Sequence, residues 1–285
     1  MGGARPKALL DFDGEQWVIT FSEGEPADTA LIEHATMTLA READLRTAST
    51  MAVRLTDGHA IAIKRFDRDR GARRHCLSAA EPFGDPELAQ LLRRKGVAQG
   101  ERYVADMREL FHRRVFSILM DNSDDHEKNH ALIASGHRPY ELSAAYDVLP
   151  ARQALGFQQM RVGRQDADST LENALSMSSL FSLKRDDAAA EVRMIAAVVS
   201  GWKEHFRACG VTAADIEQYA EQIDRPFLRQ QREAQWPGSP RSERGAAGCT
   251  FTHVRLPLPL DGSHVKFSQP GGERERVIVR YGLLP

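Results

Sequence analysis

Residues 122–129 read NSDDHEKN, and this polar stretch follows an apolar segment with helical spacing. In that segment, the apolar residues lie on one face of a helix that ends near Met120: Met107, Leu110, Phe111, Val115, Ile118 and Leu119. Beyond the polar stretch, residues 130–134 and 140–142 have the composition of short strands, and Ser135-Gly136 between them favours a turn. The sequence therefore predicts a polar loop followed by a β-hairpin, both inserted in a helical region.

Two side chains of this loop, Asp124 and Asn129, are five positions apart. Protein-kinase catalytic loops hold a base and a metal-binding amide at this spacing. The hairpin returns the chain to Asp147, 18 residues after Asn129, so a second carboxylate can lie beside the amide. Carboxylate and amide oxygens are hard ligands that suit Mg²⁺ on nucleotide phosphates. An isolated pair of this kind is more often a solvated loop, but the flanking helix and hairpin favour phosphoryl transfer.

A competing motif overlaps the same loop. Residues 126–130, HEKNH, match H-E-x-x-H, in which two imidazoles on one helix bind zinc and the glutamate acts as a base. That motif needs a continuous helix, whereas residues 122–125 are turn formers, strand-like residues follow, and no third ligand is evident. A zinc hydrolase is therefore the less favoured alternative.

The rest of the chain divides into a β-rich beginning, a helical middle and a low-complexity end. Asp13-Gly14 and Asp57-Gly58 each separate two strand-like runs and so predict two hairpins, with a helix between them that carries Leu31, Ala35 and Leu39. Helical spacing then dominates, and residues 237–285 contain 6 Pro and 7 Gly. We expect an α+β fold with a small β-rich lobe (1–66), a mostly helical lobe (67–235) and a disordered tail (236–285).

Composition excludes several classes of protein. The 38 Lys and Arg residues against 40 Asp and Glu residues leave a formal net charge of −2, which argues against a protein built mainly to neutralise nucleic acid. The three cysteines form no C-x-x-C pair, so a thiolate zinc site is not indicated. No apolar run approaches the ~18 residues of a membrane helix, and the N-terminus lacks the apolar stretch of a signal peptide. These features predict a cytoplasmic protein.

Several motifs, in order, resemble the HipA family of serine/threonine kinases, the toxins of bacterial toxin-antitoxin pairs. The most specific are NSDDHEKNH at 122–130 and LSAAYDVLP at 142–150. GGARPKA at 2–8 is similar to the family's loop near the nucleotide phosphates, LIEHATMTLAREADL at 31–45 to its small-lobe helix, and KRFDR at 64–68 to the strand that links the lobes. FQQMRVGRQDADSTLENAL at 157–175 and the helix around Trp202 resemble its helical lobe, so the likeness extends to about Gln231.

The resemblance implies a two-lobed, protein-kinase-like fold of the HipA type that uses ATP and Mg²⁺. It makes Asp124 the catalytic base, with His126 as a polar neighbour of the phosphates, and it makes Asn129 and Asp147 the metal ligands. The predicted nucleotide-binding residues are Lys7, Lys64, Arg65 and Phe66, where Phe66 and the backbone at 64–65 border the adenine. Glu33 falls where the small-lobe helix offers a carboxylate to a phosphate-binding lysine.

Two features depart from the family pattern. The family usually has a lysine at the position of Thr20, and a neutral hydroxyl cannot replace a cation unless Lys7 or Arg5 reaches in. Relatives also have a further small-lobe segment and a regulatory serine upstream of the position of Gly2-Gly3. We therefore expect an N-terminally short form, whose missing lobe is supplied by a separate short protein or lost from a truncated gene.

The sequence thus predicts an ATP-dependent serine/threonine protein kinase that acts as a toxin. By resemblance, its protein substrate is an aminoacyl-tRNA synthetase and its partner a small DNA-binding antitoxin, with no membrane and no direct nucleic-acid contact. Thr20 and the short N-terminus keep open the alternative of a non-catalytic pseudokinase that acts as a binding module.

Overall fold

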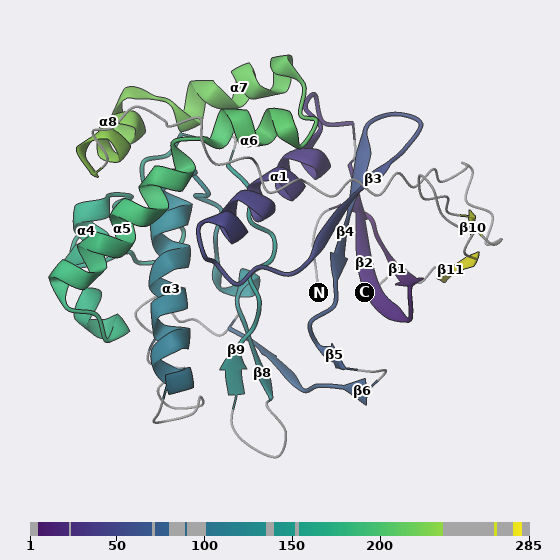
Figure 1. The fold of residues 1–285 in the computed structure, drawn as a ribbon, viewed down its shortest axis with the longest axis horizontal. Helices are drawn as coiled ribbons and strands as arrows, with labels where there is room; N and C mark the ends of the chain where they lie inside the picture. The colour runs from purple at the N-terminus through teal and green to yellow at the C-terminus, as the bar shows by residue number, and fades with distance from the viewer. Residues whose placement is uncertain are drawn as a thin grey trace.

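The protein has an α+β fold, as the sequence predicts, in which a β-sheet is followed along the chain by a mostly helical region. The computed structural model describes residues 5–22, 24–69, 72–79, 89, 101–134, 140–151, 154–235, 265–266 and 276–280. Figure 1 shows the sheet beside the helices, with helix α1 (Thr29–Glu42) between the sheet and helices α6 and α7.

Both predicted hairpins are confirmed. The first joins β1 (Lys7–Phe12) to β2 (Glu15–Phe21) through Asp13 and Gly14, whose φ angles of 52° and 70° suit the tight turn of an Asp-Gly hairpin. The second joins β3 (Thr50–Arg54) to β4 (His59–Lys64), and β4 pairs antiparallel with β2. The resulting order, β1-β2-β4-β3, places the first hairpin next to the returning strand of the second.

Helix α1 connects the two hairpins and packs against one face of the sheet. Its first turn is capped by Asp28, whose side chain accepts a hydrogen bond from the Leu31 N–H. Its apolar side chains, among them Leu31, Ala35 and Leu39, belong to a hydrophobic core that continues into the helical region. Because one core spans both regions, α1 fixes the sheet against the helices.

The helical region is built around the long helix α3 (Glu101–Leu119), which packs against α5 (Arg185–Val199). The other helices are α4 (Leu171–Ser176), α6 (Trp202–Ala208), α7 (Ala213–Ile223) and α8 (Pro226–Gln235), with a short 3-10 helix at Ser178–Phe181. The predicted hairpin after the polar loop is confirmed as β8 (Ala131–Ala134) and β9 (Tyr140–Leu142), and β7 (Cys76–Ser78) joins it. A two-stranded ribbon of β5 (Arg68–Asp69) and β6 (Ala72–Arg73) precedes β7.

Two short strands are described in the C-terminal tail, whose predicted disorder stays a prediction. Strand β11 (Arg276–Arg280) pairs antiparallel with β1 and with β10 (Val265–Lys266), so it extends the sheet at the open edge of β1. The run from Val277 to Val279 is rich in β-branched residues, which favours a strand at an edge with unpaired backbone groups. The rest of the predicted disordered tail lies outside the described residues.

The predicted boundaries at residues 66 and 235 remain predictions. Within the described residues, none of the helices is both long enough and apolar enough to cross a membrane.

Candidate active site

A cavity of about 910 Å³ lies between the sheet and the helical region. This volume falls within the roughly 300–1,000 Å³ typical of small-molecule sites. All eight predicted site residues line it: Lys7, Lys64, Arg65, Phe66, Asp124, His126, Asn129 and Asp147. Sequence positions from 7 to 147 are thus brought to one place, although their chemical roles remain predictions.

The sheet supplies one wall of this cavity. Lys7 on β1 and Thr20 on β2 are cross-strand partners and therefore share a face of the sheet, and both line the cavity. The Phe21 N–H donates to the Pro6 carbonyl, which continues the pairing beyond Lys7 toward Arg5. Thr20 is 5% exposed and lines the cavity, so this position of the sheet presents a small neutral side chain.

Helix α1 contributes the buried carboxylate of Glu33 to the same wall. Arg5 Nη2 donates to Glu33 Oε2 at 3.1 Å and lies 3.9 Å from Asp147 Oδ1. Burial raises the pKa of Glu33 to about 7, the nearby charge of Asp147 adds to the rise, and Arg5 opposes it. One guanidinium therefore lies between two carboxylates that come from different regions of the fold.

The end of the cavity near β4 is arranged differently. Lys64 Nζ lies 3.0 Å from Glu15 Oε1 at the surface, and the Arg65 guanidinium binds both carboxylate oxygens of Asp67 at 2.9 and 2.7 Å. Burial alone would raise the pKa of Asp67, but the hydrogen bonds and charges of Arg65 and Arg68 hold it below its usual range. Glu15 and Asp67 thus balance the charges of Lys64 and Arg65. The ring of Phe66 and the backbone of residues 64–65 are then the groups at this end of the cavity that can contact a ligand.

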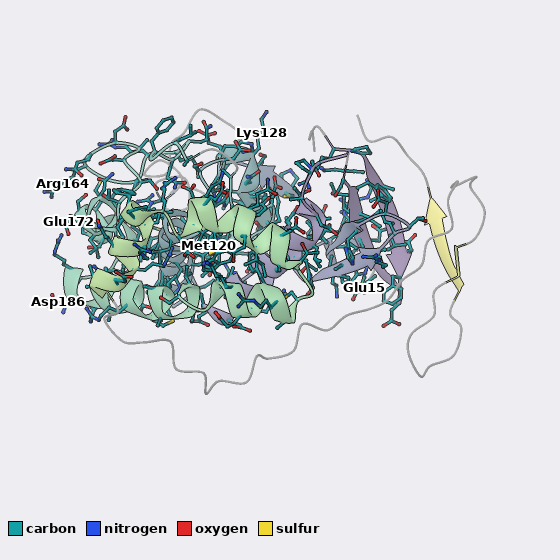
Figure 2. All side chains as sticks on the ribbon, turned by 90° about the horizontal axis from the view of Figure 1, so that it is seen from above. Glu15, Met120, Lys128, Arg164, Glu172 and Asp186 are labelled. Atoms are coloured by element: carbon teal, nitrogen blue, oxygen red, sulfur yellow. The ribbon has the colours of Figure 1, made fainter. Side chains whose placement is uncertain are left out.

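The opposite wall is the polar loop, which the sequence places directly after α3. Its last part, Glu127–Asn129, is a 3-10 helix, with Asn129 buried and Asp124 exposed at the cavity. His126 lines the cavity, and its Nδ1 is buried without a hydrogen-bond partner among the described residues. Figure 2 shows Lys128 of this loop at the surface, near the boundary between helices and sheet, whereas Met120 is buried.

The H-E-x-x-H motif does not have the geometry of a zinc site. His126 and His130 both have extended backbone conformations, and only three residues between them are helical. His130 Nε2 lies 3.1 Å from Asp125 Oδ1. Across the described ranges, no cluster of three or more His, Cys, Asp or Glu side chains is arranged to hold a metal ion. The continuous helix that the zinc motif requires is therefore not formed.

The profile of one protein family, described as the HipA-like C-terminal domain, matches residues 1–220. The chain belongs to this family. A curated relative, "Putative kinase Y4dM" of Sinorhizobium fredii, is 32% identical in an alignment of 155 residues that covers 48% of this chain and 37% of that protein. The match thus spans little more than a third of the relative's length.

Two solved structures resemble the fold of this HipA-like chain. HipA of Shewanella oneidensis MR-1, solved with HipB and its operator DNA, has 16% identity and a TM-score of 0.63, and the match covers 82% of this chain and 64% of that one. The proinflammatory kinase CtkA of Helicobacter pylori has 12% identity and a TM-score of 0.53, with 82% and 93% covered. These likenesses show that the fold is of the same kinase-like type.

Three supports of the HipA-like site were not found from the sequence. Asp121, which precedes the loop, is buried with a φ of 55° and accepts two hydrogen bonds from the Arg225 guanidinium at 2.9 and 3.0 Å. Burial raises the pKa of Asp121 to about 6, and Arg225 opposes the rise. The Asp121 carbonyl also accepts from the Ala151 N–H, which ties the loop to the segment after Asp147.

The remaining two supports also line the cavity. Tyr146 donates its hydroxyl to the Lys128 carbonyl at 2.7 Å, and its ring lies 5.3 Å from that of Phe66. The Arg5–Glu33 pair is the other, because the sequence placed both residues near the phosphates but did not pair them. The only sequence signal for Tyr146 is its position beside Asp147.

Proposed function

We propose that this HipA-like chain is a serine/threonine protein kinase that transfers the γ-phosphoryl group of ATP to a protein hydroxyl. The observation that carries the proposal is the convergence of Asp124, Asn129 and Asp147 on one cavity, opposite a sheet wall that carries cations. The sequence spacing alone suggested these three residues, and in the fold all three line the same cavity.

Asp124 suits the role of base. Its carboxylate is exposed at the cavity, where a substrate hydroxyl can approach it. In the transfer, the hydroxyl oxygen forms a bond to the γ-phosphorus while the bond from that phosphorus to the bridging oxygen of the β-phosphate breaks. Asp124 takes the hydroxyl proton, and ADP leaves with the electron pair of the broken bond.

Asn129 and Asp147 suit a magnesium ion. Their amide and carboxylate oxygens are hard donors on the same cavity, and Mg²⁺ in phosphoryl-transfer sites needs few protein ligands because phosphate oxygens and water complete its shell. When bound, Mg²⁺ neutralises charge on the phosphates. Asp147 has a φ of 58°, a conformation that Asp tolerates better than most residues, and this directs the chain sharply at the metal-ligand position.

The cavity end formed by Phe66 and residues 64–65 suits the adenine. The aromatic pair of Phe66 and Tyr146 offers a flat apolar surface, and the charges of Lys64 and Arg65 are occupied by Glu15 and Asp67. A neutral base therefore fits here better than a phosphate does.

We extend the proposal to a toxin of a toxin-antitoxin pair. The support is family membership together with the fold likeness to HipA, which was solved with HipB and operator DNA. The proposed partner is a small DNA-binding antitoxin, and the proposed substrate is an aminoacyl-tRNA synthetase.

Two carboxylate substitutions test the assigned roles. Asp124→Asn should lower phosphotransfer by about a hundredfold or more while leaving Mg·ATP affinity nearly intact, because it removes only the base. Asp147→Asn should weaken Mg·ATP binding itself. Calorimetry with Mg²⁺ measures affinity, and transfer of labelled γ-phosphoryl to the protein itself or to added aminoacyl-tRNA synthetases measures activity.

The matched control is Arg185→Ala, which removes an exposed ion pair with Glu172. Figure 2 shows Glu172 at the end of the molecule away from Glu15 of the sheet. Equal loss of ATP affinity in both aspartate variants would contradict the division of roles. A wild-type protein that binds Mg·ATP but transfers no phosphoryl would identify the pseudokinase instead.

A further inference from the structure

Kinase sites pair a lysine on the sheet with a glutamate on the small-lobe helix, and the lysine contacts the α- and β-phosphates. In this chain, α1 supplies the glutamate as Glu33, but Thr20 stands where the resemblance leads us to expect a lysine. Glu33 is 2% exposed, and a buried carboxylate requires a partner. Another residue of the chain must therefore supply the cation that pairs with Glu33.

Arg5 occupies that point. Its Nη2 lies 3.1 Å from Glu33 Oε2 and 3.9 Å from Asp147 Oδ1, so the guanidinium sits between the helix carboxylate and the predicted metal ligand. Its side chain is 19% exposed and lines the cavity. A guanidinium has five donor hydrogens, and both contacts use Nη2, so the pairing with Glu33 takes up only part of its donor capacity.

The backbone holds Arg5 in this place. Lys7 pairs with Thr20, and the Phe21 N–H donates to the Pro6 carbonyl, so the chain runs antiparallel to β2 as far as Pro6. Side chains alternate along such a pair, which directs Arg5, Lys7 and Thr20 to the same face. A residue before proline is also restricted to extended conformations. Arg5 thus approaches, from the neighbouring strand, the space that a longer side chain at Thr20 would enter.

We infer that Arg5 is the phosphate-binding cation of this site, and that it replaces, from the segment before β1, the lysine that the family usually carries on β2. The inference rests on the proposed function, since it assigns a role in ATP binding. It makes Thr20 a permissive residue, because a small neutral side chain there leaves room for the guanidinium.

Other cations of the cavity fit this role less well. Lys64 and Arg65 are paired with Glu15 and Asp67 at the other end. Lys7 also lines the cavity, but it is Arg5 whose guanidinium contacts the buried Glu33 carboxylate, at 3.1 Å. Arg5 is thus the cation joined to both carboxylates within the described part of the chain.

The test compares the affinities of purified variants for Mg·ATP and for adenosine by calorimetry. Arg5→Ala should weaken Mg·ATP binding by about tenfold or more, as expected for the loss of a charge-assisted phosphate contact. Adenosine has no phosphate, so its affinity should be unchanged, which also shows that the cleft is folded. Lys7→Ala should weaken Mg·ATP binding less than Arg5→Ala does, and Arg5→Lys should retain most of the affinity.

A second pair of variants tests whether a lysine at position 20 can replace the cation at position 5. Thr20→Lys should recover most of the lost Mg·ATP affinity in the Arg5→Ala background, but should change wild-type affinity by less than about threefold, because Arg5 already supplies the charge. Recovery only in the Arg5→Ala background supports the inference, because it shows that the two positions supply the same cation.

Several results would overturn the inference while leaving the kinase assignment intact. These are an Arg5→Ala protein that binds Mg·ATP as the wild type does, equal losses for ATP and adenosine, and a Thr20→Lys change that recovers nothing in the Arg5→Ala background. A wild-type protein that binds neither Mg·ATP nor adenosine would instead overturn the proposed function, and the inference with it.

Discussion

The two walls of the cavity are stabilised in different ways. The loop wall, residues 121–129, is fixed by groups distant in sequence: Arg225 binds Asp121 from 104 positions away, and the Ala151 N–H donates to the Asp121 carbonyl. The sheet wall, formed by Arg5, Lys7, Thr20 and Glu33, relies on strand pairing and one ion pair.

The charged pairs of the two walls therefore differ in role: one stabilises the protein, and the other is available to a ligand. The Asp121–Arg225 pair is 1% and 14% exposed and satisfied within the protein, so it holds the loop in place. The Arg5–Glu33 pair lines the cavity and leaves donors of Arg5 unused by Glu33. We therefore expect loss of the Asp121–Arg225 pair to reduce stability first and loss of the Arg5–Glu33 pair to reduce binding first.

The largest expected effect breaks the loop wall. Arg225→Ala leaves the Asp121 carboxyl buried without its bidentate partner, and breaking a buried pair costs about 3 kcal/mol or more. For a domain of this size, the melting temperature should fall by about 6 to 12 °C. Thermal denaturation of Arg225→Ala beside Arg5→Ala measures the contrast.

Arg5→Ala should lose much less stability at neutral pH. The pKa of Glu33 is already raised to about 7 by burial and by Asp147, so without Arg5 this carboxyl can become protonated at modest cost. Equal losses in melting temperature would show that the two walls do not differ in the proposed way.

Local patterns made the loop wall predictable. The spacing of Asp124 and Asn129 and the return to Asp147 depend on residues close in sequence, and the Asp-Gly turns identified the hairpins for the same reason. The resemblance to the family, and not local spacing, pointed to Thr20, which the pairing of β1 with β2 places beside Lys7 at the cavity.

Long-range pairings could not be predicted in this way. Arg5 and Glu33 are 28 positions apart, and Asp121 and Arg225 are 104 apart, so no local spacing connects them. The sequence contains many arginines, and only the packing of α1 and α8 selects these two. The pairing of β11 with β1 was missed because a short β-branched run lies within a segment rich in glycine and proline.

The next largest effect is a loss of stability in acid, which we expect from His34 on helix α1. Burial, together with the charges of Arg41, His205 and His59, lowers the pKa of His34 on α1 to about 4. Its Nδ1 contacts Thr50 Oγ1 at 2.8 Å, and its Nε2 is buried without a hydrogen-bond partner among the described residues. Protonation in the folded protein is therefore unfavourable.

The pKa of histidine in an unfolded chain is about 6.5, so between pH 6.5 and 4 the unfolded state binds more protons. Stability should be lost as the pH falls through this window, by about 3 kcal/mol from His34 alone. Denaturant unfolding at pH 4 and pH 7 should show a smaller acid loss in His34→Gln than in the wild type. His75→Gln, at an exposed position, is the control that should keep the wild-type slope.

The smallest effect concerns the connection between Asp147 and the loop wall. Tyr146→Phe removes the hydroxyl that donates to the Lys128 carbonyl at 2.7 Å but keeps the ring that lies 5.3 Å from Phe66. One hydrogen bond contributes about 1 kcal/mol, so the melting temperature should fall by about 2 to 4 °C. Because the ring remains, adenosine affinity should be unchanged, whereas Mg·ATP affinity should fall by up to about fivefold as Asp147 loses its tie to the loop.

Tyr140→Phe removes a comparable bond to His75 outside the cavity and should lower stability without changing either affinity. If both tyrosine variants bind Mg·ATP equally well, Tyr146 stabilises the fold only, and the proposed metal ligand Asp147 is held in place by the backbone bond from Ala151 to Asp121.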